Sequence, residues 1–283
     1  MKIAVAGKGG VGKTTIVAWL GDYLARSGKT VWMVDADTAL SLGQASGLER
    51  SRMPEALFAR KELLEERIRP AGGAMMDLNP HVSDLPESLF VPLPLGEPAF
   101  PGVTPGEKRL LVMGALSNAG GGCACDSNAL LKALLAHLVL EREEWVLVDM
   151  EAGVEHLGRG TVAHVDRLLV ISEPSMRSLE TAAQVGRMAR DLGLSRQVLI
   201  LNQATPEDAD RLPDIDGLPS RRMVIPALHS LEERQLRTAS VLGLKKEDSR
   251  ALDVFFAELI DALTSAFPAV LHVPVKTGET STV

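Results

Sequence analysis

The chain has 283 residues, of which 46% are hydrophobic and 24% charged, and its formal net charge is -7. This composition predicts a compact α/β protein and argues against nucleic-acid binding, because the chain lacks the basic runs that neutralise phosphate backbones. No apolar stretch reaches the ~18 residues that a spanning helix needs, and the chain starts directly in a strand-like segment. We therefore expect a cytoplasmic protein with no membrane partner.

Apolar runs that predict β-strands alternate with segments of helical spacing along most of the chain. The predicted strands are 2–6, 30–34, 110–113, 145–150, 167–171, 197–201 and 223–225, and the predicted helices include 16–27, 59–69 and 249–267. Such alternation is typical of a doubly wound, mostly parallel sheet flanked by helices. We expect a single domain over 1–267 with an irregular proline-rich insertion at about 70–105, followed by a frayed tail at 268–283.

The first predicted strand leads into a glycine-rich loop. It reads Gly7-Lys8-Gly9-Gly10-Val11-Gly12-Lys13-Thr14-Thr15. Residues without a Cβ are needed where a backbone crowds anionic oxygens, so this loop predicts a nucleoside triphosphate site. Lys13 can reach the β- and γ-phosphates, and Thr14 can place its hydroxyl on Mg²⁺. A glycine-rich loop without phosphate chemistry is the alternative.

Lys8 distinguishes this loop from an ordinary phosphate loop, where almost any residue is tolerated and a lysine is by default a solvated charge. The string K-G-G-V-G-K-T-T resembles the deviant Walker A motif of the family that contains the nitrogenase iron protein and the Min and Par ATPases. The resemblance implies a P-loop NTPase fold and a homodimer with ATP between its subunits. In it, Lys8 would act across the interface like an arginine finger in hydrolysis.

Acidic residues follow two predicted strands, at the edge where ligands of such sheets bind. Asp35 and Asp37 follow the second strand, and Asp149 ends the strand at 145–150. A solvated turn is the alternative for the first two. The resemblance implies that Asp37 lies in switch I, positions the attacking water and contributes to the Mg²⁺ site, and that Asp149 is the Walker B residue for Mg²⁺. The family often has proline after Asp37, where this chain has Thr38.

Two further strand ends carry residues that resemble base-binding positions of the same family. Asn202 follows the strand at 197–201, and its amide can hydrogen-bond an adenine edge. Pro226 follows the strand at 223–225, where the family closes over the base. A capping asparagine and an ordinary loop proline are the alternatives.

The only two cysteines, Cys123 and Cys125, lie within one tripeptide behind three glycines. A strained disulfide in a reducing compartment is disfavoured, and burial as small apolar side chains is the alternative. Two thiolates are too few for a closed site, which usually takes four ligands. A two-fold axis would supply the other two, so we expect one divalent ion, Ni²⁺ or Zn²⁺, between two protomers.

The resemblance narrows to CooC-type ATPases, which mature the nickel site of carbon monoxide dehydrogenase. It rests on the P-loop, the Cys-x-Cys pair and the stretch AGVEHLGRGT at 152–161. It implies an ATPase that uses Mg²⁺ and ATP or ADP, delivers nickel, and has carbon monoxide dehydrogenase as its client. His156, within that stretch, is either structural or part of a relay between the nucleotide and the cysteines.

Other classes of the same superfamily remain as alternatives. A nitrogenase-reductase-like electron carrier has two cysteines per protomer, but far apart in sequence. An iron-sulfur scaffold ATPase has C-x-x-C rather than C-x-C spacing. A Min-type positioning ATPase needs a basic amphipathic terminal helix, whereas the segment 249–267 contains Asp253, Glu258 and Asp261.

Overall fold

The structure is a computed structural model that describes residues 1–68, 84–114, 133, 144–150 and 165–265. Its β-strands are β1 (Lys2–Gly7), β2 (Thr30–Ala36), β3 (Val91–Pro92), β4 (Lys108–Val112), β5 (Glu144–Met150), β6 (Arg167–Ser172), β7 (Gln197–Asn202) and β8 (Arg222–Ile225). Its α-helices are α1 (Lys13–Arg26), α2 (Leu42–Ala45), α3 (Lys61–Ile68), α4 (Leu85–Leu89), α7 (Met176–Asp191), α8 (Pro206–Asp210), α9 (His229–Gln235) and α10 (Lys246–Thr264). Two short 3-10 turns, η1 (Arg50–Arg52) and η2 (Leu57–Ala59), precede α3.

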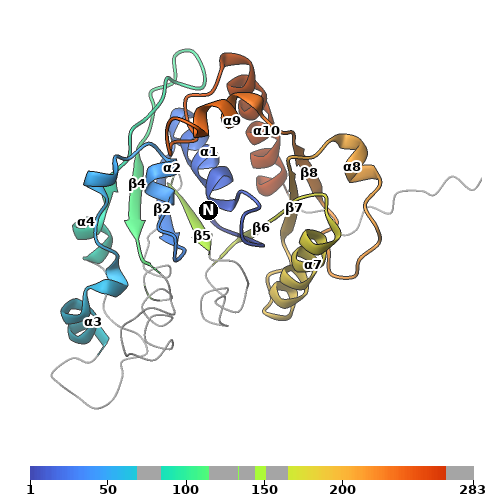
Figure 1. Ribbon diagram of the computed structural model, residues 1–283. Coiled ribbons are helices and arrows are strands. Elements are labelled where there is room, and N and C mark those ends of the chain that lie inside the picture. The colour runs from blue at the N-terminus through green and yellow to red at the C-terminus, as the bar shows by residue number, and fades with distance from the viewer. Residues whose placement is uncertain (69–83, 115–132, 134–143, 151–164, 266–283) are drawn as a thin grey trace, which may run out of the picture.

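The strands form one eight-stranded sheet in the order β3-β4-β2-β5-β1-β6-β7-β8 (Figure 1). All neighbours pair in parallel except β3, which runs antiparallel to β4 at the edge. The predicted doubly wound, mostly parallel sheet is thus confirmed. From β1 the chain continues to β2 on one side of the sheet, and from β5 it continues to β6 on the other side. The strand order therefore reverses between β1 and β5, which is the usual position of a ligand crevice in this architecture.

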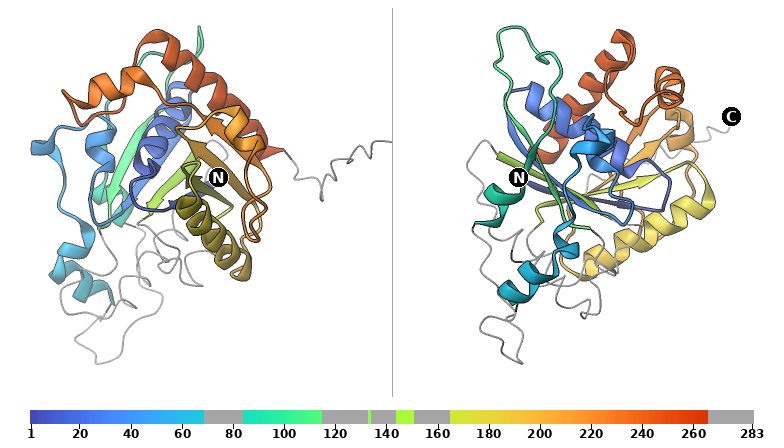
Figure 2. Two further views of the ribbon diagram at one scale, coloured as in Figure 1. Left: turned by 45° about the vertical axis from the view of Figure 1, so that its right-hand side comes forward. Right: turned by 60° about the vertical axis from the view of Figure 1, so that its left-hand side comes forward.

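The sheet is buried on both faces, and alternate strand residues contribute to two separate cores. In β1, Ile3 and Val5 face the core under α1 and α10, whereas Ala4 and Ala6 face the core that includes α7 and α4. Figure 2 shows the sheet between these layers. This burial explains the continuous apolar strands of the sequence. Within the described part of the chain, no helix combines the length and apolar character needed to cross a membrane.

The proline-rich segment is more ordered than we expected from the sequence. Residues 85–89 form α4 and residues 91–92 form the edge strand β3, whereas residues 93–105 contain no helix or strand, as predicted. Leu85 is only 2% exposed, and Phe90 packs edge-on against Trp32 at 5.8 Å between ring centroids. Burial of these apolar side chains outweighs the local preference of proline for irregular structure, and Pro86 in the first turn of α4 is tolerated there. The rest of the predicted insertion, 70–83, and the tail lie outside the described residues.

A buried charge network fixes α1 against the sheet and α10. The ammonium of Lys108, whose side chain is fully buried, donates to Asp22 at 2.6 Å. Arg26 donates to the same Asp22 at 2.7 Å and to Asp253 of α10 at 2.6 Å. Burial lowers the pKa of Lys108, and the contact with Asp22 opposes that shift. The network therefore sets the position of the helix that begins at the P-loop.

We predict that Asp22→Ala destabilises the protein strongly, because it leaves the Lys108 ammonium buried without its acceptor. Breaking a buried pair in this way typically costs about 3–5 kcal/mol. The double variant Asp22→Ala/Lys108→Met removes both charges and should recover most of that loss. Urea denaturation of the two variants measures the difference, and equal stability would contradict a pairing role for Lys108.

Candidate nucleotide-binding site

The P-loop (residues 7–15) needs glycine at two positions for identifiable reasons. A Cβ on Gly7 would lie 2.2 Å from the carbonyl oxygen of Ile171 in β6. Gly12, with φ +94°, would place a Cβ 2.4 Å from the Nδ2 of Asn202 at the end of β7. The loop is thus wedged against the ends of two strands, and α1 starts immediately after it at Lys13.

A pocket of about 820 Å³, counting its open mouth, lies on this loop. It is lined by Gly9, Gly10, Gly12, Lys13, Thr14, Thr15, Asp37, Thr38, Ala39 and Ser41. The structure therefore joins the predicted phosphate loop to the loop after β2, which we call the switch I loop (residues 37–41). Sequence reasoning missed Ala39 and Ser41, since neither is a residue type that by itself signals nucleotide binding.

Inside the site, the first turn of α1 contacts the end of β5. The hydroxyl of Thr14 donates to the Oδ2 of Asp149 at 2.6 Å. The ammonium of Lys13, which is buried, donates to the carbonyl of Lys8 at 3.3 Å. Lys13, Thr14 and Asp149 are thus brought together as the sequence predicted.

Asp35 and Asp149 lie opposite each other on the adjacent strands β2 and β5, and both are fully buried. Burial raises the pKa of Asp149 to about 7, an effect strengthened by Asp35 and opposed by the Thr14 hydroxyl and Lys13. Burial likewise raises the pKa of Asp35 to about 7, opposed by the backbone N-H groups of Leu42 and Asp37. Two carboxylates in this position favour a cationic ligand.

These side chains suit Mg²⁺ by the chemistry of their donor atoms. Oxygen ligands from one or two carboxylates, completed by phosphate oxygens and water, are what Mg²⁺ usually takes. The Oδ1 of Asp149 is buried and has no hydrogen-bond partner among the described residues, so it can accept a ligand. Thr14, Asp149 and Asp37 are the protein groups that would hold the ion.

Asp37, the predicted water-positioning residue, is partly exposed and faces the pocket from the switch I loop. Its Oδ1 accepts the backbone N-H of Ala39 at 2.9 Å and the hydroxyl of Thr38 at 3.2 Å. Leu40, next along the loop, has φ +47°, a conformation uncommon for a branched side chain. The loop is therefore held in a conformation that its own sequence does not favour.

The two predicted base-binding residues lie together at the edge of the sheet. Asn202 is paired in register with Ile225, which directly precedes Pro226. Pro226 is exposed, whereas Asn202 is buried and its Nδ2 donates to the carbonyl of Val11 at 2.9 Å. Asn202 thus supports the P-loop from beneath, and its predicted contact with adenine stays a prediction.

Cys123, Cys125 and His156 lie outside the described residues. The segment with the cysteines follows Gly114, two residues beyond β4, and the segment with His156 follows β5. β5 carries the Asp149 that contacts Thr14, and β4 pairs with β2, which leads into the switch I loop. The predicted metal site and the predicted relay therefore stay predictions.

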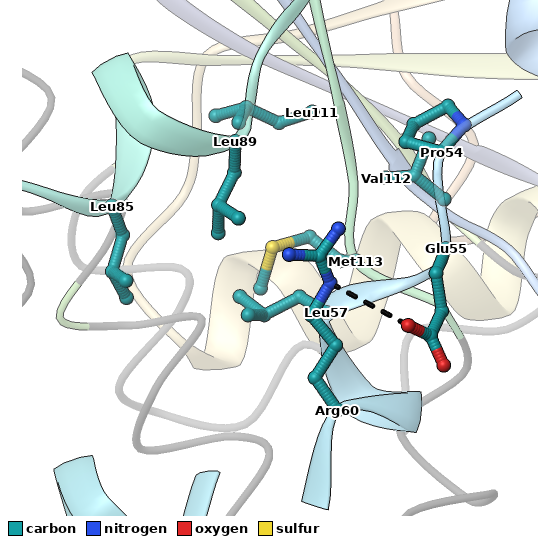
Figure 3. Close-up of a pocket in the computed structure, with 9 residues that line it drawn as sticks. All are labelled: Pro54, Glu55, Leu57, Arg60, Leu85, Leu89, Leu111, Val112 and Met113. Carbon is teal, nitrogen blue, oxygen red and sulfur yellow. Dashed lines mark ion pairs between the residues drawn. The ribbon is translucent and has the colours of Figure 1, made fainter. Parts of the chain in front are cut away.

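A separate, largely apolar depression lies between η2, α4 and the end of β4, with about 310 Å³ of empty space when the part open to solvent is counted (Figure 3). It is lined by Pro54, Glu55, Leu57, Arg60, Leu85, Leu89, Leu111, Val112 and Met113. Arg60 extends among the leucines, with its Nε 3.9 Å from the Oε2 of Glu55. This pocket shares no lining residue with the nucleotide pocket.

Comparison with known proteins agrees with this site. Residues 2–238 match the CobQ/CobB/MinD/ParA nucleotide binding domain, so the chain belongs to that family. The carbon monoxide dehydrogenase accessory protein CooC of Rhodospirillum rubrum is 42% identical over 229 residues, covering 78% of this chain and 82% of that protein. The predicted resemblance to CooC-type ATPases is thus confirmed.

Solved structures of the family have the same fold. MinD in the MinC:MinD complex of Aquifex aeolicus superposes with a TM-score of 0.62 at 21% identity, covering 96% of this chain and 98% of that one. MinD of Pyrococcus horikoshii, solved with Mg-ADP, gives 0.61 at 20% identity, covering 92% and 96%. Together, the family and the site define this chain as an ATPase that binds adenine nucleotide and Mg²⁺.

We predict that Gly12→Ala weakens Mg-ADP binding about 10- to 100-fold more than Gly10→Ala does. Both glycines have positive φ, but a Cβ on Gly10 meets nothing within 4 Å, whereas one on Gly12 meets Asn202. Crowding of this kind costs about 1–3 kcal/mol. Calorimetric titration measures the affinities. Equal losses in the two variants would contradict the close contact with Asn202. In an Asn202→Ala background, Gly12→Ala should cost no more affinity than Gly10→Ala does.

We also predict that Asp149→Asn changes the pH dependence of stability without nucleotide. The native state binds the Asp149 proton more tightly than the unfolded chain does, so the unfolding free energy falls as pH rises from 3.8 to about 7. The asparagine variant lacks this proton. Its melting temperature should therefore exceed that of the wild-type protein by an amount that grows across this window to several degrees, since one pKa unit corresponds to about 1.4 kcal/mol. A difference that does not vary with pH would contradict the raised pKa.

Proposed function

We propose that this ATPase is a homodimeric accessory protein that binds nickel and delivers it for maturation of the carbon monoxide dehydrogenase active-site cluster. The observation that carries the proposal is the 42% identity to the accessory protein CooC, in a chain whose only two cysteines form a Cys-x-Cys pair. An ATPase alone needs no cysteine, whereas a carrier of a soft or borderline metal needs thiolates.

The described residues support a division of labour in hydrolysis. Water positioned by Asp37 attacks the γ-phosphorus, and the bond to the bridging oxygen of ADP breaks. The products are ADP and phosphate, and the proton lost by the attacking water is released to solvent. Lys13 and the backbone N-H groups of the P-loop stabilise the charge on the phosphates. Thr14, Asp149 and Asp37 are the groups that would hold Mg²⁺, which when bound would supply positive charge to offset that of the phosphates.

Lys8 links hydrolysis to dimerisation in this proposal. Lys8 is not among the residues that line the pocket of its own subunit, and its backbone carbonyl accepts a hydrogen bond from Lys13. Across a two-fold axis, the ammonium of Lys8 would reach the nucleotide of the partner and stabilise the transition state there. ATP binding then closes the dimer, and hydrolysis opens it.

Cys123 and Cys125 supply the metal site of the proposed dimer. Two thiolates from each subunit give the four sulfur ligands that a closed site for Zn²⁺ or a square-planar site for Ni²⁺ requires. The same two-fold axis that serves Lys8 would bring the two pairs together. Closure of the dimer by ATP would thereby change how tightly the metal is held.

The decisive experiment measures bound metal and oligomeric mass together. Reduced protein is titrated with Ni²⁺ or Zn²⁺, with and without Mg-ATP, and analysed by light scattering. We predict one metal per dimer, lost in Cys123→Ser and in Cys125→Ser, while Mg-ADP binding is unchanged. Metal binding that survives both substitutions would contradict the proposal, and a brown protein absorbing near 400 nm would indicate an iron-sulfur cluster.

The role of Lys8 is tested with a matched pair of lysine variants. Lys8→Ala should lose ATP-dependent dimerisation and hydrolysis while binding Mg-ADP as a monomer. Lys246→Ala, which removes an exposed lysine at the start of α10, should behave as the wild-type protein. If Lys8→Ala dimerises normally with ATP, the trans-acting role is wrong.

A further inference from the structure

Asp35 holds both ends of the switch I loop, a role that neither the resemblance nor the reaction assigns to it. Its Oδ2 accepts the backbone N-H of Leu42 at 3.0 Å, just beyond the loop. Its Oδ1 accepts the backbone N-H of Asp37 at 3.4 Å, at the start of the loop. One buried carboxylate therefore spans the loop from beneath.

The helix after the loop depends on this carboxylate. Leu42 is the first residue of α2, and its N-H has no partner within the helix. Ser41, in the capping position, makes no side-chain hydrogen bond to the helix. Asp35, seven residues upstream, thus accepts the helix N-H that a neighbouring capping side chain usually accepts. Because Asp35 is itself fixed in β2, the helix start and the end of the loop are fixed with it.

The loop needs such a restraint because its own sequence provides little. The family often has proline after the second acid, which would fix the backbone there, and this chain has Thr38. Leu40 is held at φ +47° with its side chain packed against the core under α1. A segment with a strained residue keeps its conformation only when its surroundings determine it. Asp35 and the packing of Leu40 are the surroundings that do so.

The backbone of Asp35 extends the restraint to a second strand. Its carbonyl oxygen accepts the N-H of Met113 at 2.8 Å and that of Gly114 at 3.3 Å, where the chain leaves β4. Asp35 consequently cannot shift without disturbing β4 as well. This arrangement makes it a rigid base for the loop, and it distinguishes Asp35 from Asp37, which lies on the side of the site toward solvent.

We propose that Asp35 is a positioning residue for ATP hydrolysis, which acts by holding Asp37 and the switch I loop in place over the nucleotide. The proposal rests on the role of Asp37 given above. In this role Asp35 acts through its hydrogen bonds to the backbone of Asp37 and Leu42. Its effect is on the rate of the chemical step and not on nucleotide affinity, because the P-loop, which binds the phosphates, is held separately by β6 and β7.

The test is a double-mutant cycle with Asp35→Asn and Asp37→Asn. The amide introduced by Asp35→Asn keeps the shape of the side chain but presents a donor to one of the two N-H groups, so the loop loses one restraint. We expect kcat to fall about 10- to 100-fold, the range that misplaced catalytic groups produce. The Kd for ADP measured without Mg²⁺ should stay within about threefold of the wild-type value. The double variant should be no slower than Asp37→Asn alone.

Leu40→Gly provides an independent route to the same loop and remains informative if Asp35→Asn does not fold. Glycine frees the backbone and removes the packed side chain, so kcat should again fall without loss of Mg-ADP binding. Normal hydrolysis in Asp35→Asn beside an inactive Asp37→Asn, or losses that multiply in the double variant, would overturn the positioning role. An active Asp37→Asn would overturn the assignment of Asp37 itself, and with it this proposal.

Discussion

Two carboxylates buried side by side, Asp35 on β2 and Asp149 on β5, are the constraint on which the site depends. Parallel pairing in register places them at the same level of the sheet. Because successive side chains of a strand alternate between the two faces, both acids lie on the face that packs against α1. Burying two acids together is unfavourable, as their raised pKa values show. The Thr14 hydroxyl, Lys13 and backbone N-H groups oppose this by stabilising the charged carboxylates. The arrangement is therefore prepared for a cation before any ligand binds.

The rest of the fold holds this arrangement in place. The P-loop is fixed by close contacts with the ends of β6 and β7, which exclude a Cβ at Gly7 and Gly12. At its other end, α1 is fixed by two ion pairs. Asp22 accepts from Lys108, and Arg26 donates to Asp253. Phosphate-binding N-H groups, a hydroxyl and two carboxylates are thus presented from three elements that cannot move independently. Such preorganisation is what electrostatic stabilisation of phosphoryl transfer requires.

The switch I loop differs in character from the P-loop. The P-loop is held by close contacts that leave no room for a side chain at Gly7 or Gly12. The switch I loop is held by hydrogen bonds to Asp35 and by the packing of Leu40 against the core. Contacts of the second kind are weaker and can be exchanged when the γ-phosphate binds or leaves. The P-loop is therefore rigid, whereas the switch I loop can change its hydrogen bonds. This difference suits a protein whose proposed function couples hydrolysis to the opening and closing of a dimer. The metal-binding cysteines of the proposal follow β4, whose end is bonded to the backbone of Asp35.

The sequence by itself determined the fold class, every strand of the sheet except β3, and the P-loop, because apolar runs, glycine spacing and residue type are local properties. It also predicted Asp37 and Asp149 as site residues, since acids after buried strands stand out by type. Only the tertiary structure decided that Asp35 restrains the loop after it, that Asn202 supports Val11, and that the proline-rich segment contributes a helix and an edge strand. These features depend on pairs of residues far apart in the chain, and on burial energies that outweigh local preference. Lys8, Cys123 and Cys125 are a further case: the sequence names them, and their predicted roles depend on a second copy of the chain.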